Sequence, residues 1–159
     1  TDPIFVASAD IRKEGPLWRC WYTSNTKWRV TEEGPVPRYH IRYAESRDGI
    51  HWERHGRVAI DFADDNEYAI SRPWVAYADG RYRMWYSYRG HSYRIGYAES
   101  ADGLEWERMD DAAGITVSDR GFDSGMIEYA AVIETDGRSV MFYNGNKFGY
   151  DGIGMAIFE

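Results

Sequence analysis

The chain has 159 residues, room for one ordinary globular domain, and its 43% hydrophobic and 16% aromatic content excludes disorder. A formal net charge of −7 disfavours nucleic-acid and anionic-membrane partners. The single cysteine, Cys20, excludes an internal disulfide, and no apolar run reaches the ~20 residues of a membrane helix. Nothing resembles a secretory signal, so we expect a cytoplasmic protein, although a chain that begins at Thr1 leaves a removed leader open.

In chain order, the predicted elements are short strands in three units. The first unit contains Ala9–Arg12, Leu17–Ser24, His40–Ser46 and His51–Arg54. The second contains Pro73–Tyr77, Arg81–Tyr88, Arg94–Ser100 and Glu105–Arg108, and the third Ala130–Glu134, Ser139–Asn146 and Ile153–Phe158. No segment shows a convincing 3.6-residue period, so we expect almost no helix.

One stretch occurs twice. Residues Tyr39–Arg54 (YHIRYAESRDGIHWER) return as Tyr93–Arg108 (YRIGYAESADGLEWER). Alternating residues on either side of an Asp-Gly turn predict a β-hairpin. A repeat of about fifty residues, with one small sheet per unit, is typical of a β-propeller. The fold predicted is therefore all-β, made of antiparallel four-stranded blades.

All three units align strand by strand. The second strands align at Cys20-Trp21-Tyr22, Met84-Trp85-Tyr86 and Met141-Phe142-Tyr143, and the third strands align at Ile41, Ile95 and Ile153. We interpret residues 1–159 as a single partial propeller domain with units at about 7–56, 67–110 and 123–159. Cys20 falls on a core position.

Two connecting stretches are rich in charge and glycine, Thr26–Arg38 and Met109–Asp123. Both are predicted to be loops, and loops on a rigid propeller commonly carry binding groups.

Three blades are too few to close a ring, because propellers close with four to eight. The chain is either a fragment or half of a homodimer that closes a six-blade ring, and we expect the homodimer. The strand-like residues Pro3–Ala7 could supply the outer strand that the third unit lacks.

The motif Tyr-Ala-Glu-Ser-x-Asp-Gly-x-x-Trp, with Glu67–Met84 and Tyr143–Ala156, resembles five-bladed propeller glycosidases of glycoside hydrolase families 43 and 32. The resemblance is strongest to glycosidase-like proteins of bacterial polysaccharide gene clusters, and the chain covers only their later three blades.

The resemblance implies three carboxylates that project into the central channel of the propeller. They stand at the starts of the inner strands of successive blades. The first lies in an early blade that this chain lacks. The second lies in an Arg-Asp-Pro motif, but Arg72-Pro73 has no Asp between. The third corresponds to Glu128, although an acid of the relatives is replaced by Gly125.

Glycoside hydrolysis needs two carboxylates that flank the sugar. Channel-facing candidates are Glu67, Asp123 and Glu128. Burial among Tyr129, Met126 and neighbouring rings would raise the pKa of Glu128, as a general acid requires, while the alternative is a structural ion pair with Arg72. Glu67 is the candidate base or nucleophile, or else belongs to a solvated acidic loop.

Arg72 could bind a sugar carboxylate or hydroxyls, or lock the blade starts together. Trp28 and Trp74 are candidates for stacking on sugars, against a role in the core. The remaining candidate substrate-binding residues are Asp123, Arg89, His91, Tyr93, Asn144 and Asn146. No cysteine–histidine spacing or phosphate loop predicts a metal or cofactor.

Two recurring acidic positions are interpreted as structural. Asp48 and Asp102 are predicted to cap their own turns, and Glu45 and Glu99 recur in the repeated motif as architecture. The function favoured is a glycosidase-like protein that acts on or binds a carbohydrate in the channel. A non-catalytic glycan-binding or assembly module, and a truncated hydrolase, remain the alternatives.

Overall fold

The computed structural model describes residues 4–32 and 34–158, and in these residues it is all-β apart from one 3-10 turn at Asp110–Ala112. None of its helical segments has the length and apolarity to cross a membrane. The strands are β1 (Val6–Glu14), β2 (Leu17–Thr31), β3 (Gly34–Ser46), β4 (Val58–Ile60), β5 (Ala69–Ala78), β6 (Arg81–Arg89), β7 (Tyr93–Ser100), β8 (Glu107–Arg108), β9 (Glu128–Thr135), β10 (Arg138–Asn144) and β11 (Ile153–Phe158).

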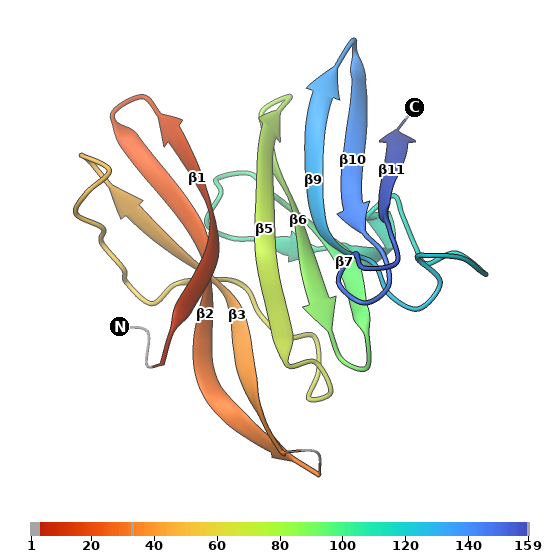
Figure 1. The fold of residues 1–159 in the computed structure, drawn as a ribbon. Helices are drawn as coiled ribbons and strands as arrows, with labels where there is room; N and C mark the ends of the chain where they lie inside the picture. Colours follow the sequence, from red (N-terminus) through yellow and green to blue (C-terminus); the bar gives the residue numbers. More distant parts are fainter. Residues whose placement is uncertain (1–3, 33, 159) are drawn as a thin grey trace.

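The strands form three blades. Antiparallel ladders join β1 to β2 to β3 to β4, then β5 to β6 to β7 to β8, and then β9 to β10 to β11. A single parallel bridge, Tyr39 to Ala69, connects the first two blades. The inner strands β1, β5 and β9 lie side by side and run in the same direction (Figure 1). The predicted all-β propeller fold is confirmed.

The alignment of the three units holds residue by residue. In the ladder between the inner and second strands, Ile11 pairs with Cys20, Val75 with Met84, and Val132 with Met141. At the channel end of the same ladders, Ala7 pairs with Thr23, Ser71 with Ser87, and Glu128 with Asn144. Glu128 therefore occupies the position of Ser71 and Ala7, as the sequence predicts.

The core lies between blades rather than within one sheet. Trp21, Ile41 and Tyr43 of the first blade share a buried cluster with Val75 and Met84 of the second. A second cluster joins the next two blades in the same way, through Trp85, Ile95, Tyr97, Val132, Met141 and Tyr143. Alternation of side chains across each strand places one set on either face, so each blade packs against both neighbours.

The repeated Asp-Gly turns are capped by their own aspartates, which confirms the structural interpretation. Oδ1 of Asp48 accepts the backbone N–H groups of Ile50 and His51, both at 2.8 Å. Oδ1 of Asp102 accepts those of Leu104 and Glu105 at 2.8 and 3.0 Å. These bonds hold the pKa of Asp102 below its usual range.

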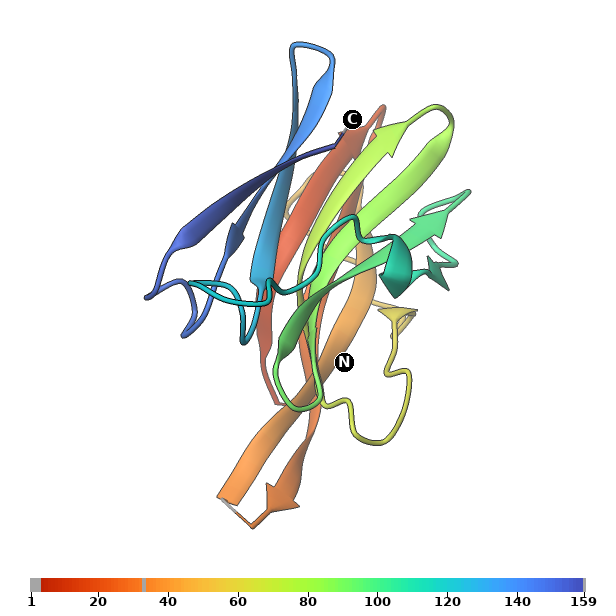
Figure 2. The same cartoon turned by 90° about the vertical axis from the view of Figure 1, so that its right-hand side faces the viewer.

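The prediction of a loop over Thr26–Arg38 is wrong. β2 and β3 continue as a paired ribbon from Lys27–Arg38 to Thr31–Gly34, and the ribbon extends beyond the rest of the sheets (Figure 2). Pro35 and Pro37 suggest a loop in the sequence, but proline is tolerated on an edge strand, and both strands of this ribbon are edges.

Two further predictions about strands need correction. Val6 and Ala7 begin β1 and pair with Ser24 and Thr23, so Pro3–Ala7 does not supply the outer strand of the third unit, and Pro3 itself lies outside the described residues. The predicted strand His51–Arg54 is reduced to one bridge between Glu53 and Glu45, and β4 follows as the outer strand.

Candidate functional site

The site begins with an irregularity shared by the three inner strands. Each departs from regular pairing near its channel end: β1 between Ala7 and Ala9, β5 between Ser71 and Trp74, and the ladder of β9 opposite Phe142 and Asn144. β-Bulges re-aim side chains and are frequent beside active sites. The channel end of the inner strands is therefore where the fold departs from its repeat.

Two large residues at these bulges have a left-handed backbone. Arg72 has φ 54° and Tyr129 has φ 59°, a conformation that costs an ordinary residue on the order of 1–3 kcal/mol. Hydrogen bonds from the neighbouring blade stabilise both. The amide of Arg72 donates to Oγ of Ser8 at 3.2 Å, and the amide of Tyr129 donates to Oγ of Ser87 at 2.8 Å.

Two hollows open at this place. One, of about 540 Å³, is lined by Phe5, Ala7, Ser8, Thr23, Tyr39, Ser71, Arg72 and Tyr129. The other, of about 220 Å³, is lined by Ser8, Ala9, Asp10, Arg72, Pro73, Trp74, Tyr129, Ala130 and Ala131. Both share Ser8, Arg72 and Tyr129, one residue from each inner strand, so the hollows lie on the channel face of the three blades.

Glu128 lies at the start of β9 with a side chain that is 0% exposed. Neither carboxyl oxygen has a hydrogen-bond partner among the described residues. Burial raises the pKa of Glu128 to about 7, although the guanidinium groups of Arg89 and Arg72 act to lower it. Because no ion pair with Arg72 forms, the carboxyl remains free to hold a proton near neutral pH.

The two arginines are held by aromatic rings. The guanidinium of Arg72 lies 4.7 Å from the ring centroid of Tyr129. That of Arg89 lies 5.6 Å from Tyr68 and 5.4 Å from Tyr93. Stacking orients a guanidinium plane and leaves its N–H edge available to a ligand.

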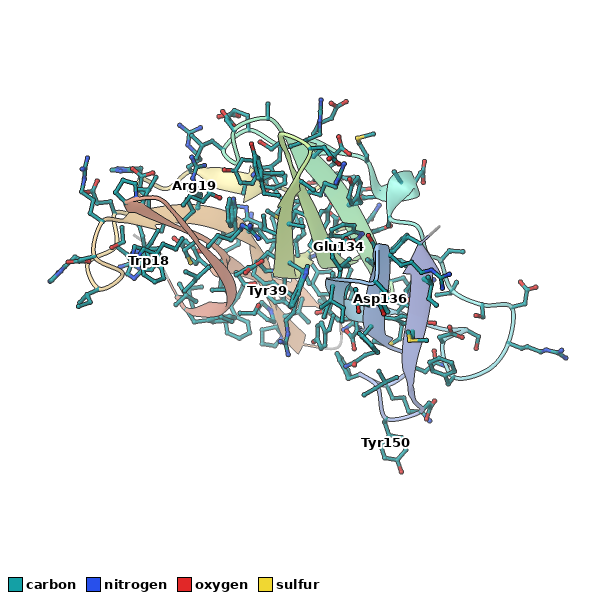
Figure 3. All side chains as sticks on the ribbon, turned by 90° about the horizontal axis from the view of Figure 1, so that it is seen from above. Trp18, Arg19, Tyr39, Glu134, Asp136 and Tyr150 are labelled. Atoms are coloured by element: carbon teal, nitrogen blue, oxygen red, sulfur yellow. The ribbon has the colours of Figure 1, made fainter. Side chains whose placement is uncertain are left out.

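Tyrosines complete the cluster. The hydroxyls of Tyr39 and Tyr93 are 2.7 Å apart, and the rings of Tyr93 and Tyr129 have centroids 6.2 Å apart. Tyr39 lies between the first and second blades (Figure 3). Burial raises the pKa of Tyr129 to about 12, so this ring keeps its proton at neutral pH.

Glu67, the candidate base, is in another environment. Its carboxylate receives two hydrogen bonds from Arg108, at 2.8 and 3.0 Å, and one from the amide of Ala63 at 2.8 Å. Arg108 also pairs with Asp110 at 2.5 Å. Among the described residues, no hydrogen bond joins Glu67 to Glu128, and the charged groups that shift the pKa of Glu128 are Arg89 and Arg72.

The remaining polar candidates divide between structural and exposed positions. Asp123 is buried and accepts the hydroxyl of Tyr143 at 2.8 Å. Oδ1 of Asn146 accepts the amides of Gly125 and Met126 at 2.7 and 3.0 Å, and Asn144 donates to the carbonyl of Phe148. These three residues hold the loops around β9. His91 is exposed and lines a separate hollow beside Arg29 and Tyr68.

The tryptophans do not meet at the cluster. Nε1 of Trp74 donates to the carbonyl of Val132 at 2.7 Å, and its ring packs on the core between the second and third blades while lining the smaller hollow. Trp28 is 51% exposed on the β2–β3 ribbon. The structure thus brings together Arg72, Arg89, Tyr93 and Glu128 from the predicted residues.

Sequence reasoning missed the tyrosines Tyr39, Tyr68 and Tyr129. A signal existed for Tyr39, because it opens the first copy of the repeated stretch and Tyr93 opens the second. Their hydroxyls meet because the two copies sit on adjacent blades. Nothing in the local sequence marks Tyr68, and Tyr129 was expected only as a ring that buries Glu128, not as the partner of Arg72.

No protein-family profile matches the chain. The chain is 42% identical over 159 residues to Rv1502, an uncharacterised protein of Mycobacterium tuberculosis H37Rv. This match covers 99% of the chain and 52% of the relative. The corresponding protein of strain CDC 1551 has the same identity and coverage. The chain therefore spans about half the length of the curated relatives it matches.

Solved structures with the same fold are glycoside hydrolases. A family 117 glycoside hydrolase of Zobellia galactanivorans has a TM-score of 0.76 at 21% identity, over 94% of this chain and 50% of that one. The family 32 β-fructofuranosidase of Bombyx mori has a TM-score of 0.74 at 17% identity, over 97% of this chain and 34% of that one. At these identities the likeness establishes the fold alone, a partial β-propeller.

Proposed function

We propose that the channel end of β1, β5 and β9 is a carbohydrate site of the glycosidase type, in which Glu128 is the proton donor. The observation that carries the proposal is a fully buried carboxyl, without a hydrogen-bond partner, whose pKa lies at about 7. A general acid works best when its pKa lies near the working pH. The fold, which is shared with glycoside hydrolases, supports a sugar as the ligand.

In such a reaction Glu128 gives its proton to the glycosidic oxygen. The bond between that oxygen and the anomeric carbon breaks, its electron pair stays on the oxygen, and water supplies the new hydroxyl. Arg72 and Arg89 hold the sugar, and the tyrosine rings offer flat faces against which it packs. The second carboxylate of the reaction is the candidate Glu67 or an acid of a blade outside this chain.

A specific observation favours a second candidate, glycan binding without hydrolysis. The carboxylates other than Glu128 that lie near the site have partners: Glu67 is engaged by Arg108, and Asp10, which lines the smaller hollow, accepts the amide of Val75. Hydrolysis requires two carboxyl groups about 5–10 Å apart. A site with one of them would bind a glycan and leave it intact.

Glu128→Gln distinguishes the two candidates, because glutamine keeps the shape of the side chain and cannot donate the acid proton. Turnover of a panel of aryl glycosides should fall by about 10²–10⁴-fold if Glu128 is the general acid. Binding of oligosaccharides, measured by calorimetry, should persist. Turnover equal to that of the wild type would remove Glu128 as the acid, and wild-type binding with no turnover would favour the binding module.

A further inference from the structure

The arginines of this chain fall into two groups. One group forms ion pairs with carboxylates, as the pairs of Arg19 with Glu14, Arg81 with Glu99, and Arg108 with Glu67 illustrate. Arg72 and Arg89 form no ion pair with any described residue, and their guanidinium groups lie over tyrosine rings. Both act on the pKa of Glu128, so two cations without an ion-pair partner gather around one buried carboxyl.

The environment of Arg89 makes the missing partner more costly. Its Nε is buried and has no hydrogen-bond acceptor. A buried donor without an acceptor costs on the order of 1–3 kcal/mol. The same cluster holds the buried carboxyl of Glu128, which also lacks a partner. Both groups would be satisfied by a ligand that carries acceptors for the arginine and a donor or acceptor for the carboxyl.

We infer that the glycan of this site is acidic, a uronic-acid-type sugar whose carboxylate is bound by Arg72 and Arg89. This inference rests on the proposed function and narrows its substrate class. A guanidinium matches a carboxylate in a two-pronged, charge-assisted arrangement, which a neutral hydroxyl cannot equal. The rings of Tyr129, Tyr68 and Tyr93 hold the two guanidinium planes before the ligand arrives.

The state of Glu128 sets the pH dependence of binding. Below its pKa of about 7 the carboxyl is neutral, and the two arginines give the cluster a net positive charge. Above that pKa the carboxylate repels the carboxylate of the ligand and offsets one arginine. An acidic sugar should therefore bind more tightly at pH 6 than at pH 8, while a neutral sugar should show little change.

The test is calorimetric titration of the protein with trisaccharides of galacturonate, glucuronate and mannuronate, each beside its methyl ester. At pH 6 we expect at least one acidic trisaccharide to bind about tenfold or more tightly than its ester, the size of one charged hydrogen bond. Glu128→Gln should bind the same sugar with little difference between pH 6 and pH 8.

Arginine variants assign the effect to the cluster. Arg72→Gly removes the guanidinium and relieves the left-handed backbone, so it should fold and lose about tenfold in affinity for the acidic sugar. Arg89→Met should also lose about tenfold in affinity for the acidic sugar, and Arg72→Lys should retain part of the affinity. Arg138→Met is the matched control, because Arg138 is exposed at the start of β10, past the far end of β9 from Glu128, and it should change nothing.

The outcomes separate the inference from the proposed function. Equal affinity for each acid and its ester, or unchanged affinity in Arg72→Gly and Arg89→Met, would overturn the acidic class and leave a neutral glycan site. An absence of binding to the acidic and neutral sugars alike, including neutral fructans and galactans, would overturn both.

Discussion

Glu128 combines full burial with two arginines nearby, and its pKa shows which effect is larger. Arginines at contact distance would lower the pKa of a carboxyl by one to three units, yet this pKa is raised from 4.5 to about 7. The loss of hydration on burial therefore exceeds the attraction of the arginines. At neutral pH the carboxyl of Glu128 is therefore close to the midpoint of its titration and can either give or take a proton.

This state of Glu128 predicts how stability depends on pH. The folded protein keeps the proton that the unfolded chain releases between pH 4.5 and 7. The contribution of Glu128 to stability is thus largest at low pH and falls through that window by about 3 kcal/mol. The free energy of unfolding of Glu128→Gln, relative to wild type, should rise by this amount between pH 4.5 and 8 in urea titrations. A difference that does not change with pH would contradict the raised pKa.

Glu67 and Arg108 predict a different response. Both side chains are largely buried and joined by two hydrogen bonds, and removal of one partner leaves a buried charge without its pair. Arg108→Met should cost about 3–5 kcal/mol in urea unfolding. The double variant with Glu67→Gln should cost less than the sum of the two single variants. A strictly additive result would show that the pair is not coupled.

At this scale, the sequence alone located Glu128 and Arg72 but not their surroundings. The strand alignment put Glu128 opposite Ser71, and the structure agrees. Nothing in the sequence predicted that Arg72 would stack on Tyr129. That contact joins two blades through bulged residues with a positive φ. Likewise, the pairing of Glu67 with Arg108 joins residues far apart in the chain.

Among the elements, the two Asp-Gly turns share the motif Ser-x-Asp-Gly-x-x-Trp but have different tertiary contacts. The carbonyl of Gly103 accepts Nε1 of Trp21 at 2.9 Å and Nε1 of Trp106 at 3.1 Å, so the second turn is bound to the first blade. At the first turn, Gly49 lies against the ring of Trp18, which belongs to the same blade. A repeated motif thus serves as a clamp between blades in one copy and as a surface turn in the other.

These contacts predict unequal effects of the same substitution. Asp102→Ala frees the amides of Leu104 and Glu105 and loosens the turn that holds Trp21, so it should destabilise by about 1–2 kcal/mol. Asp48→Ala should destabilise less than Asp102→Ala, since its turn is exposed. Urea titrations of the two variants provide the comparison, and an equal loss would show that the clamp adds nothing.

The turns were predictable from sequence because Asp-Gly demands a particular backbone. The β2–β3 ribbon was not, because Pro35 and Pro37 suggest a loop and only the pairing of Trp28 with Pro37 and Arg29 with Val36 reveals two strands. Local turn chemistry is thus readable one residue at a time, whereas the length of a ladder depends on its partner strand.

For the whole molecule, residues at matching positions of the three blades differ in burial. The difference depends on whether a neighbouring blade covers them. Trp21 and Ile41 of the first blade are 0% exposed, because the second blade covers them. Their counterparts in the third blade, Phe142 and Ile153, are 40% and 71% exposed. At the other end Ile11 is 50% exposed, although its counterpart Val75 is 4% exposed, and an apolar hollow of about 540 Å³ opens beside it. These two faces are where further blades would pack.

The homodimer stays a prediction, and these faces give it a test. In a ring of two copies, the exposed face of the third blade that carries Phe142 would pack against the exposed face of the partner's first blade, which carries Ile11. Phe142→Glu and Ile11→Lys should each yield the 18.5 kDa monomer in sedimentation, and the double variant should recover the dimer through paired charges. Val30→Glu, on the exposed ribbon, is the control. A wild-type chain that stays monomeric at all concentrations would contradict the homodimer and favour blades from a longer chain.

The most direct measurement is a crystal structure of the protein soaked with an acidic trisaccharide that it binds. We expect the sugar in the hollow between β1, β5 and β9, with its carboxylate on Arg72 and Arg89 and an oxygen within hydrogen-bond distance of Glu128. A sugar bound elsewhere, with the carboxyl of Glu128 untouched, would contradict the assignment of this site.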